Sequence, residues 1–397
     1  MPLSRTWETP CRRGFSTRGG NARKSGTAEV RPRSEVRSRV GCPITETASS
    51  LADMTPFAAF GPNINFRPNL HRNGRAALFT RNTHDLEELA RRLRSLPGVA
   101  AKNSIGVVAD VFGGGDWWAG PGDDGAVVHD RGRNLIVGGE AMLPAFVAKD
   151  PYGAGIAAVL ANVNDLAAMG ARPLAIVDTV TGPRDVAKAI LEGLKWAAEV
   201  YEVPIVGGHL TETDGPPSLS AFGLGAADLV LSAIHAEPGQ ALVLACCLDG
   251  RMREDFLFFP SFEERGERLA GDVRTLAEVA ERGAAAAAKD VSMAGMIGSL
   301  AMLLEARKLG VQVDLDVLPV PAGVPIGDWL SCFPCFAFLL TTPAEKVGEC
   351  LEAFTARGLT AQRIGTLDDT GEVRIGDASG SVVVFDLKRE SVTRLAR

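Results

Sequence analysis

The clearest hydrophobic pattern in this chain lies between residues 150 and 173. Apolar residues recur there at the i, i+3, i+4, i+7 spacing of a helix with one buried face. The residues of this stripe are Ile156, Val159, Leu160, Val163 and Leu166. The pattern predicts a helix from about Gly155 to Met169.

The opposite side of this helix carries Asn162 and Asp165, three positions apart, among alanines and a methionine rather than lysines or glutamates. A helix that is small or apolar nearly all round is normally buried. A buried carboxylate must be paired or bound to a cation. Asp165 therefore needs a partner, unless it simply faces water, which is the alternative reading of an isolated Asp.

Upstream, the pattern predicts an amphipathic helix over 83–96 and a strand at Ser104–Ala109. A glycine-rich loop then leads to Asp123 and Asp124, directly before an apolar strand. Successive side chains of a strand point to opposite faces, so at most one of these two acids can face a given site. An ordinary acidic turn is the alternative.

Two predicted strands contain a Gly-Gly pair followed by a polar residue. The strand Asn134–Leu143 has Glu140 after its pair, and the strand Val203–Thr211 has His209 after Gly207 and Gly208. Polar groups near strand ends, beside glycines that let a ligand approach closely, are typical of α/β ligand sites. A purely structural role for His209 is the alternative.

A composition change near 233–239 predicts a domain boundary. The second half has a strand at 241–245, a helix that continues through Ala288, and a buried helix around Met296–Leu304, preceded by Asp290 and Ser292. A helix start beside glycine presents free N–H groups to an anion. Further strands are expected at 174–179, 218–224, 311–315, 335–340 and 382–386, and further helices at 183–201 and 344–357.

Composition and charge set the amino terminus apart from the rest. The 397 residues are 46% hydrophobic and 23% charged, which is enough globular material for two domains. The net charge is −6, yet residues 1–40 contain ten Lys and Arg against three Glu. We predict that 1–80 is a disordered basic tail, with Met54 as an alternative start, and that 81–233 and 234–397 are two domains. A transit peptide and a nucleic-acid-binding arm are lesser alternatives.

The seven cysteines form no disulfide framework. Cys332 and Cys335 form a CxxC pair without the second pair that a structural zinc site needs, so core packing is favoured over metal or redox chemistry. Free thiols favour a cytoplasmic location. No run approaches the roughly 18 apolar residues of a membrane span, so no membrane partner is expected.

Four motifs occur in the order found in the aminoimidazole ribonucleotide (AIR) synthetase-like superfamily. They are Gly122–Val127, Asn162–Pro173, Val206–Thr211 and Asp290–Ser292. The chain resembles this superfamily over about 100–390, together with its relatives thiamine-monophosphate kinase, selenophosphate synthetase and the hydrogenase maturation factor. The central helix is most similar to the kinase, whereas other segments are more similar to selenophosphate synthetase.

The resemblance implies an α/β fold of two domains. The amino-terminal mixed sheet, with helices on one face, would join that of a second subunit in a homodimeric barrel, and the carboxy-terminal domain would be an α/β sandwich. ATP and Mg²⁺ would bind in a cleft. Motif matching assigns the metal to Asp124, Glu140, Asp165 and Asp290, of which Asp124, Asp165 and Asp290 would also be catalytic. It assigns the cofactor to Asn162, Gly207, Gly208, His209, Ser292 and Lys102.

Some positions depart from the family pattern. Glu140 stands where the kinases carry Asp, and His209 where they carry a metal-binding Asp. The kinase's acidic substrate motif is replaced by residues 331–335. The reactive Cys or selenocysteine followed by Lys of the selenophosphate enzymes is missing, and Lys102 alone lies near the expected place.

The expected activity is an ATP- and Mg²⁺-dependent phosphoryl transfer to a small-molecule acceptor, thiamine-monophosphate-kinase-like, with no nucleic-acid partner. Carboxylates about 5 Å apart repel by roughly 3 kcal/mol per pair at an effective dielectric of 20, so several of them together require cations. A selenophosphate-synthetase-like or AIR-synthetase-like enzyme is the first alternative. The second is a non-catalytic nucleotide-binding subunit of a partner complex.

Overall fold

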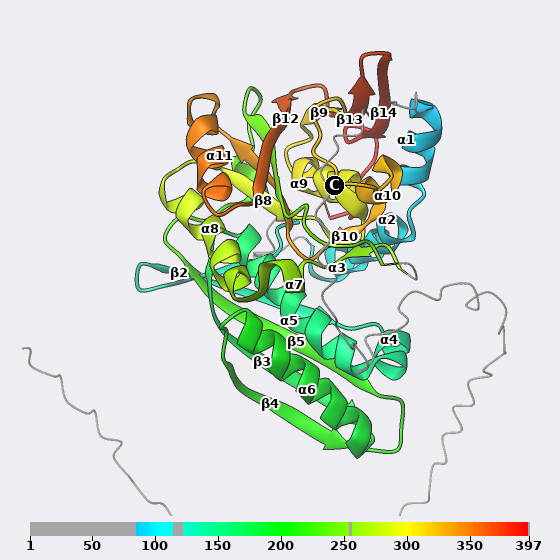
Figure 1. The fold of residues 1–397 in the computed structure, drawn as a ribbon, viewed down its shortest axis with the longest axis vertical. Helices are drawn as coiled ribbons and strands as arrows, with labels where there is room; N and C mark the ends of the chain where they lie inside the picture. Colours follow the sequence, from blue (N-terminus) through cyan, green and yellow to red (C-terminus); the bar gives the residue numbers. More distant parts are fainter. Residues whose placement is uncertain (1–84, 114–121, 254–255, 396–397) are drawn as a thin grey trace, which may run out of the picture. The chain divides into compact units, whose positions relative to one another are not determined.

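The computed structural model describes residues 85–113, 122–253 and 256–395, all of which belong to one unit of the chain. The expected disordered tail and the alternative start at Met54 lie outside these residues. The fold is mixed α/β with two principal sheets (Figure 1). Within the described ranges, neither sheet closes on itself into a barrel.

The first sheet has five strands in the order β1-β2-β5-β3-β4. Their bounds are β1 (Ala126–Asp130), β2 (Arg133–Ala141), β3 (Arg172–Gly182), β4 (Ile205–Glu212) and β5 (Ser218–Ala227). Helices α5 (Pro151–Ala168) and α6 (Arg184–Val200) lie together along one face of this sheet (Figure 1). Residues of β3 on that face, such as Ile176 and Val180, are buried, whereas Val177 and Thr179 between them are exposed.

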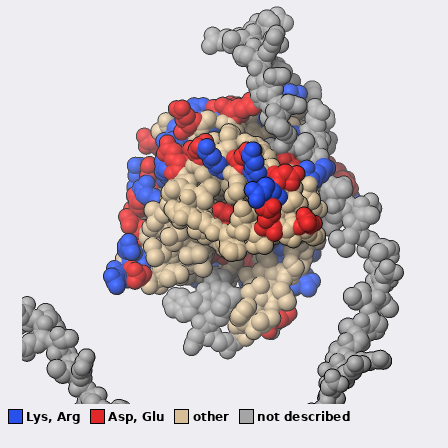
Figure 2. Space-filling model, turned by 90° about the horizontal axis from the view of Figure 1, so that it is seen from below, with Lys and Arg blue, Asp and Glu red and all other residues tan. Residues whose placement is uncertain are grey.

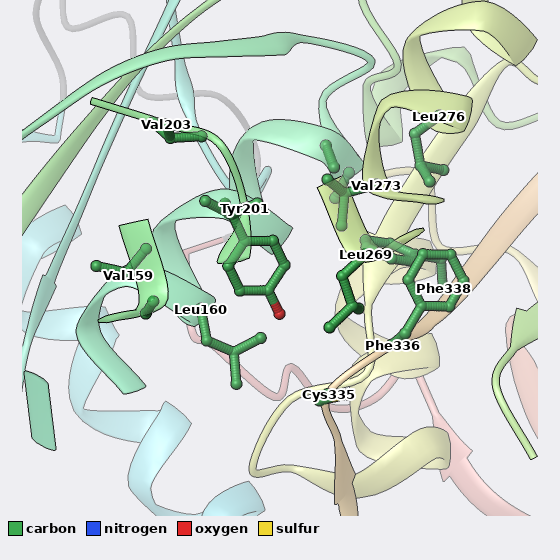
Figure 3. Packing of buried hydrophobic residues seen from close by; sticks show 14 of the residues in the cluster. Val159, Leu160, Tyr201, Val203, Leu269, Val273, Leu276, Cys335, Phe336 and Phe338 are labelled. Carbon is green, nitrogen blue, oxygen red and sulfur yellow. The ribbon is translucent and has the colours of Figure 1, made fainter. Parts of the chain in front are cut away.

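The helix predicted from the central hydrophobic pattern is α5. Asp150 caps it, because the Gly153 N–H donates to Asp150 Oδ1 at 2.9 Å. The helix is buried nearly all round, as expected, because α6 and the first sheet cover one side while α8 (Leu269–Glu281) and β8 (Ala287–Asp290) contact another. Figure 3 shows the Tyr201 ring between apolar side chains of α5 and Leu269.

The second sheet has seven strands in the order β14-β13-β9-β12-β6-β11-β8. The strands not yet given are β6 (Ala241–Cys246), β9 (Gly310–Asp314), β11 (Ala337–Thr342), β12 (Thr360–Asp368), β13 (Glu372–Asp377) and β14 (Gly380–Asp386), and β7 (Phe258–Phe259) pairs with β10 (Phe333–Pro334). The remaining α-helices are α1 (Leu86–Arg94), α2 (Pro97–Lys102), α3 (Gly106–Phe112), α4 (Pro144–Lys149), α7 (Phe262–Arg265), α9 (Gly295–Glu305), α10 (Ile326–Ser331) and α11 (Val347–Thr355). The edge strand β8 ends at Asp290, beside α5.

Two predictions of secondary structure are wrong. The segment Ser104–Ala109 is helical, because it falls in a 3-10 turn (Asn103–Ile105) and in α3. The helix expected through Ala288 ends at Glu281, and the alanine-rich segment after it forms β8, which pairs with β11 through Thr341 and Ala287. Alanine favours helix, but burial in a sheet overrides that weak preference. Strands β12 and β13 were not predicted.

The described cysteines pack in the core, since all five are buried and free. None of the helices that the structure describes combines the length and apolarity needed to cross a bilayer. On the face shown in Figure 2, acidic and basic side chains of the described residues are interspersed rather than separated by sign. The described part of that face therefore presents no extended basic surface.

The contact between α5 and α6 depends on two glycines. A Cβ at Gly155 would lie 2.3 Å from the Ile190 carbonyl oxygen, and a Cβ at Gly193 would lie 2.0 Å from the Tyr152 carbonyl oxygen. Neither position has room for a side chain, because the obstructing atoms are backbone atoms. The glycines thus set how closely the two helices approach.

We predict that Gly193→Ala lowers the free energy of unfolding by about 1–3 kcal/mol, because the added methyl group overpacks the helix contact. Urea denaturation of the full chain measures this. Gly348→Ala in α11 is the matched control, since no atom of the described residues lies within 4 Å of its Cβ position. Equal stability of the two variants would show that the close approach of α5 and α6 is unimportant.

Candidate functional site

Three acidic residues from distant parts of the chain meet beside α5. Asp124 precedes β1, Asp165 lies on α5, and Asp290 ends β8. One carboxylate oxygen from each lies within 4.8 Å of the others. The structure thus brings together three residues that the sequence singled out separately.

Asp123 and Asp124 point in different directions, although both lie in the loop before β1 and not in the strand. The Asp123 carboxylate accepts hydrogen bonds from the Ser232 hydroxyl at 2.6 Å and from the Ala233 N–H at 2.8 Å. Asp124 turns toward the other acids, and its Oδ2 accepts from the Asp290 N–H at 3.3 Å. Asp123 therefore anchors the loop, while Asp124 takes its place in the cluster.

Lys289 belongs to this cluster but was not predicted from the sequence. Its side chain is only 5% exposed, its ammonium forms an ion pair with Asp124, and it lies 3.5 Å from Asp290 Oδ1. Burial works to lower the pKa of Lys289, but the charges of Asp124 and Asp290 outweigh it and raise that pKa. A lysine within a run of buried alanines was the available signal, because Lys is almost never fully buried unless paired.

Asp165 and Glu140 are carboxylates whose ionised form is disfavoured by their surroundings. Burial raises the pKa of Asp165 well above its ordinary value, and the charges of Asp290, Asp124 and Glu140 add to the effect. Burial also raises the pKa of Glu140, whereas the charge of Lys102 lowers this pKa and the charge of Asp124 raises it. The cluster therefore contains more negative charge than the protein neutralises.

Asp290 and Lys102 complete this group. Burial, followed by the charge of Asp124, raises the pKa of Asp290 to about 6, while Lys289 and Lys102 act in the opposite direction. Lys102 ends α2 and acts electrostatically on both Asp290 and Glu140. Lys102 is thus close enough to these two acids for its charge to act on them.

Asn162 and Ser292 each present a buried oxygen without a partner among the described residues. The Asn162 amide group donates to the carbonyl oxygens of Ala158 at 2.8 Å and Ala221 at 3.2 Å, which leaves its Oδ1 unsatisfied. Ser292 follows Asp290 by two residues, and its backbone N–H donates to Ser299 Oγ at 3.0 Å. These two oxygens are free to accept or, for the hydroxyl, to donate to a ligand.

The Gly-Gly pair of β4 has a different setting from the one expected. A Cβ at Gly208 would lie 2.7 Å from Asp178 Oδ2, so the glycine makes room for a carboxylate of β3. Asp178 is itself buried, and burial raises its pKa. Within the described part of the chain, no atom lies within 4 Å of the Cβ position of Gly207. Asp178 was also missed by the sequence analysis.

His209 lies on the other face of the first sheet. It is paired in register with Thr179, whereas Gly208 is paired with Asp178. Since neighbouring side chains of a strand point to opposite faces, His209 points away from α5 and Asp165. The structure therefore does not bring His209 onto the face that carries the acidic cluster.

Two family models match the chain and together span more than half of it. The N-terminal domain model of the AIR synthase related proteins matches residues 122–227, and the C-terminal domain model matches residues 261–378. The acids of the cluster lie in both matched regions: Asp124 and Asp165 in the first, Asp290 in the second.

Several curated proteins are similar in sequence. An uncharacterized protein of Synechocystis sp. is 34% identical over 275 residues, which cover 68% of this chain and 85% of that protein. The PurL subunit of phosphoribosylformylglycinamidine synthase from Bradyrhizobium sp. is 28% identical over 68% of this chain but only 40% of its own length. Thiamine-monophosphate kinase of Rhodopirellula baltica is 32% identical over 42% of this chain and 50% of the kinase.

Solved structures share the fold at lower identity. T. maritima PurL complexed with ADP has a TM-score of 0.59 at 21% identity, covering 69% of this chain and 47% of that chain. AaThiL complexed with AMPPCP and TMP has a TM-score of 0.53 at 18% identity, covering 70% of this chain and 95% of that one. Fold, motif order and family models agree, and the chain belongs to the AIR synthase related family.

Proposed function

We propose that this protein is an ATP- and Mg²⁺-dependent phosphotransferase that acts on a small metabolite, with a thiamine-monophosphate-kinase-like reaction as the first candidate. The observation that supports it best is the acidic cluster, in which oxygens of Asp124, Asp165 and Asp290 lie within 4.8 Å of one another. Each of the three stands in a motif that resembles the family's metal-binding segments.

The donor set fits magnesium. All three ligand atoms are carboxylate oxygens, which are the ligands that Mg²⁺ prefers. Asp124, Asp165 and Asp290 would hold the ion, with Glu140 as a further donor. A bound Mg²⁺ would neutralise charge on the transferring phosphoryl group.

The chain's own polar groups would orient the nucleotide. Asn162 Oδ1 and Ser292 Oγ are buried and without partners in the described part of the chain, so they are available to order magnesium-bound water or to contact phosphate through the hydroxyl. The Asp178 carboxylate beside Gly208 repels phosphate. We therefore place the phosphates nearer to Ser292 and Lys102 than to Gly208, with Gly207 as the open position of the pair.

The relatives support nucleotide use. Solved structures of the same fold contain ADP or AMPPCP, and one similar protein is a thiamine-monophosphate kinase. The family models end at 227 and resume at 261, on either side of the proposed domain boundary at 233/234. Free, buried cysteines support a cytoplasmic location.

A homodimer is part of this proposal. On the helix-free face of the first sheet, the neighbouring strands β3 and β5 expose Val177, Phe222 and Leu224, at 38%, 43% and 37% respectively. Gly139 makes room for the Phe222 ring, since its Cβ would lie 2.5 Å from Phe222 Cδ1. We propose that this apolar face packs against a second copy to form the family's barrel.

Two other functions are each supported by a specific observation. A selenophosphate-synthetase-like or AIR-synthetase-like reaction agrees with Lys102, which lies near the acids. A non-catalytic nucleotide-binding subunit agrees with Lys289, which already neutralises part of the cluster, and with the position of His209 on the opposite face. Turnover distinguishes this second class from an enzyme.

Asp165→Asn should reduce Mg²⁺-dependent ATP turnover by about 100-fold or more, because a metal ligand that stabilises transition-state charge is lost. Phosphate release measured with and without candidate metabolites tests this. Asp185→Asn, at an exposed position of α6, is the control and should behave like the wild type. Wild-type protein that binds ATP but never turns it over would contradict the enzyme proposal.

Mg-ATP should raise the melting temperature of the full chain, whereas ATP with excess EDTA should not. A ligand at 100 times its dissociation constant adds about 2.7 kcal/mol, which a thermal-shift assay detects. Adding thiamine phosphate or other metabolites to a non-hydrolysable Mg-nucleotide complex identifies the acceptor by a further shift. An equal shift in EDTA would remove magnesium from the proposal.

Phe222→Asp should convert a dimer of about twice 41.8 kDa into a monomer, because it places a charge in the apolar face. Light scattering after size exclusion measures the mass, and circular dichroism checks the fold. Val383→Asp on β14, an exposed apolar residue of the second sheet, is the matched control. A monomeric wild type would refute the barrel.

A further inference from the structure

Lys289 occupies an unusual place for a lysine. Every residue of β8 is buried, and the lysine lies between Ala288 and Asp290. Removing an ammonium group from water costs several kcal/mol unless charged partners surround it closely. Lys289 can therefore occupy this buried position because the neighbouring acids balance its charge. The charge of Lys289 belongs to the cluster.

Lys289 neutralises only part of the negative charge of this group. Asp124, Glu140, Asp165 and Asp290 are close enough for their charges to affect one another, and the charges of Lys289 and Lys102 oppose them. The carboxylates outnumber the two lysines, so the group still attracts a cation.

The Lys289 ammonium lies on the side of the cluster formed by Asp124 and Asp290. It pairs with Asp124 and lies 3.5 Å from Asp290 Oδ1. Asp165 has no salt bridge to any described residue, although its carboxylate oxygen is within 4.8 Å of the ligand oxygens of the other two acids. The side nearest Asp165 is thus the one left for a cation from solution.

We propose that the Lys289 ammonium is a resident cation that takes the place of one metal ion between Asp124 and Asp290. It competes with divalent ions for these two carboxylates and repels an ion bound at Asp165. The free protein consequently binds its divalent ion more weakly than the same acids would without the lysine. This inference rests on the proposed function and concerns the metal occupancy of the same site.

The test is Mn²⁺ binding to the full chain without nucleotide, followed by electron paramagnetic resonance. Lys289→Met keeps the length of the side chain and removes its charge. We expect this variant to bind Mn²⁺ about tenfold more tightly or better than the wild type, because a repulsive charge within a few ångströms is removed. Lys195→Met is the control, since that lysine lies on the exposed face of α6. Affinities of wild type and Lys289→Met within twofold would overturn the inference.

Thermal melting shows whether the variants still fold. Lys289→Met should melt at a lower temperature than the wild type without metal, and Mn²⁺ should restore more stability to it than to the wild type. Adding Asp124→Asn to Lys289→Met should recover the melting temperature without metal. If the double variant recovers but Mn²⁺ stabilises the wild type and Lys289→Met equally, the lysine is only a structural counter-ion and the inference fails. Absence of Mn²⁺ binding in every variant, with ATP as well as without it, would instead contradict the metal site of the proposed function.

Discussion

The arrangement of this protein depends on the burial of α5 on nearly every side. One side packs against the first sheet and α6, and another contacts α8 and β8 of the second half of the chain. Asp165 lies at this junction and is only 9% exposed. The packing of the two halves buries the Asp165 carboxylate, which has no salt bridge to any described residue. A buried carboxylate of this kind needs a cation, and this need is the basis of the proposed metal site.

Several charged groups, rather than a single partner, surround the buried carboxylates of the cluster. Asp124 and Asp290 are connected through a backbone hydrogen bond and through Lys289, while the charges of Lys102 and Asp124 act on Glu140. Each unscreened pair of acids at about 5 Å costs roughly 3 kcal/mol at an effective dielectric of 20. A protein that keeps such a cluster gives up stability for it, which is typical of a site that binds ions and charged ligands.

The first sheet separates two tasks between its faces. The face under α5 and α6 carries Glu140 and Asp178, whereas the opposite face carries His209 and the apolar side chains that we assign to a dimer. The alternation of side chains along each strand makes this division possible. His209 directly follows Gly208 in β4. Its side chain nevertheless lies on the face opposite to that of Asp178 and Glu140.

The sequence by itself determined the elements whose signal is local. The periodic stripe from Ile156 to Leu166 predicted α5, and the motif order identified the family that the two domain models confirm. Tertiary structure decided what depends on distant partners. The alanine-rich segment before Asp290 is a strand because β11 lies beside it, and the valine-rich segment after Ser104 is a helix although such short apolar runs fit either structure. Lys289 meets Asp124 from 165 residues away, so no local pattern could reveal that pair.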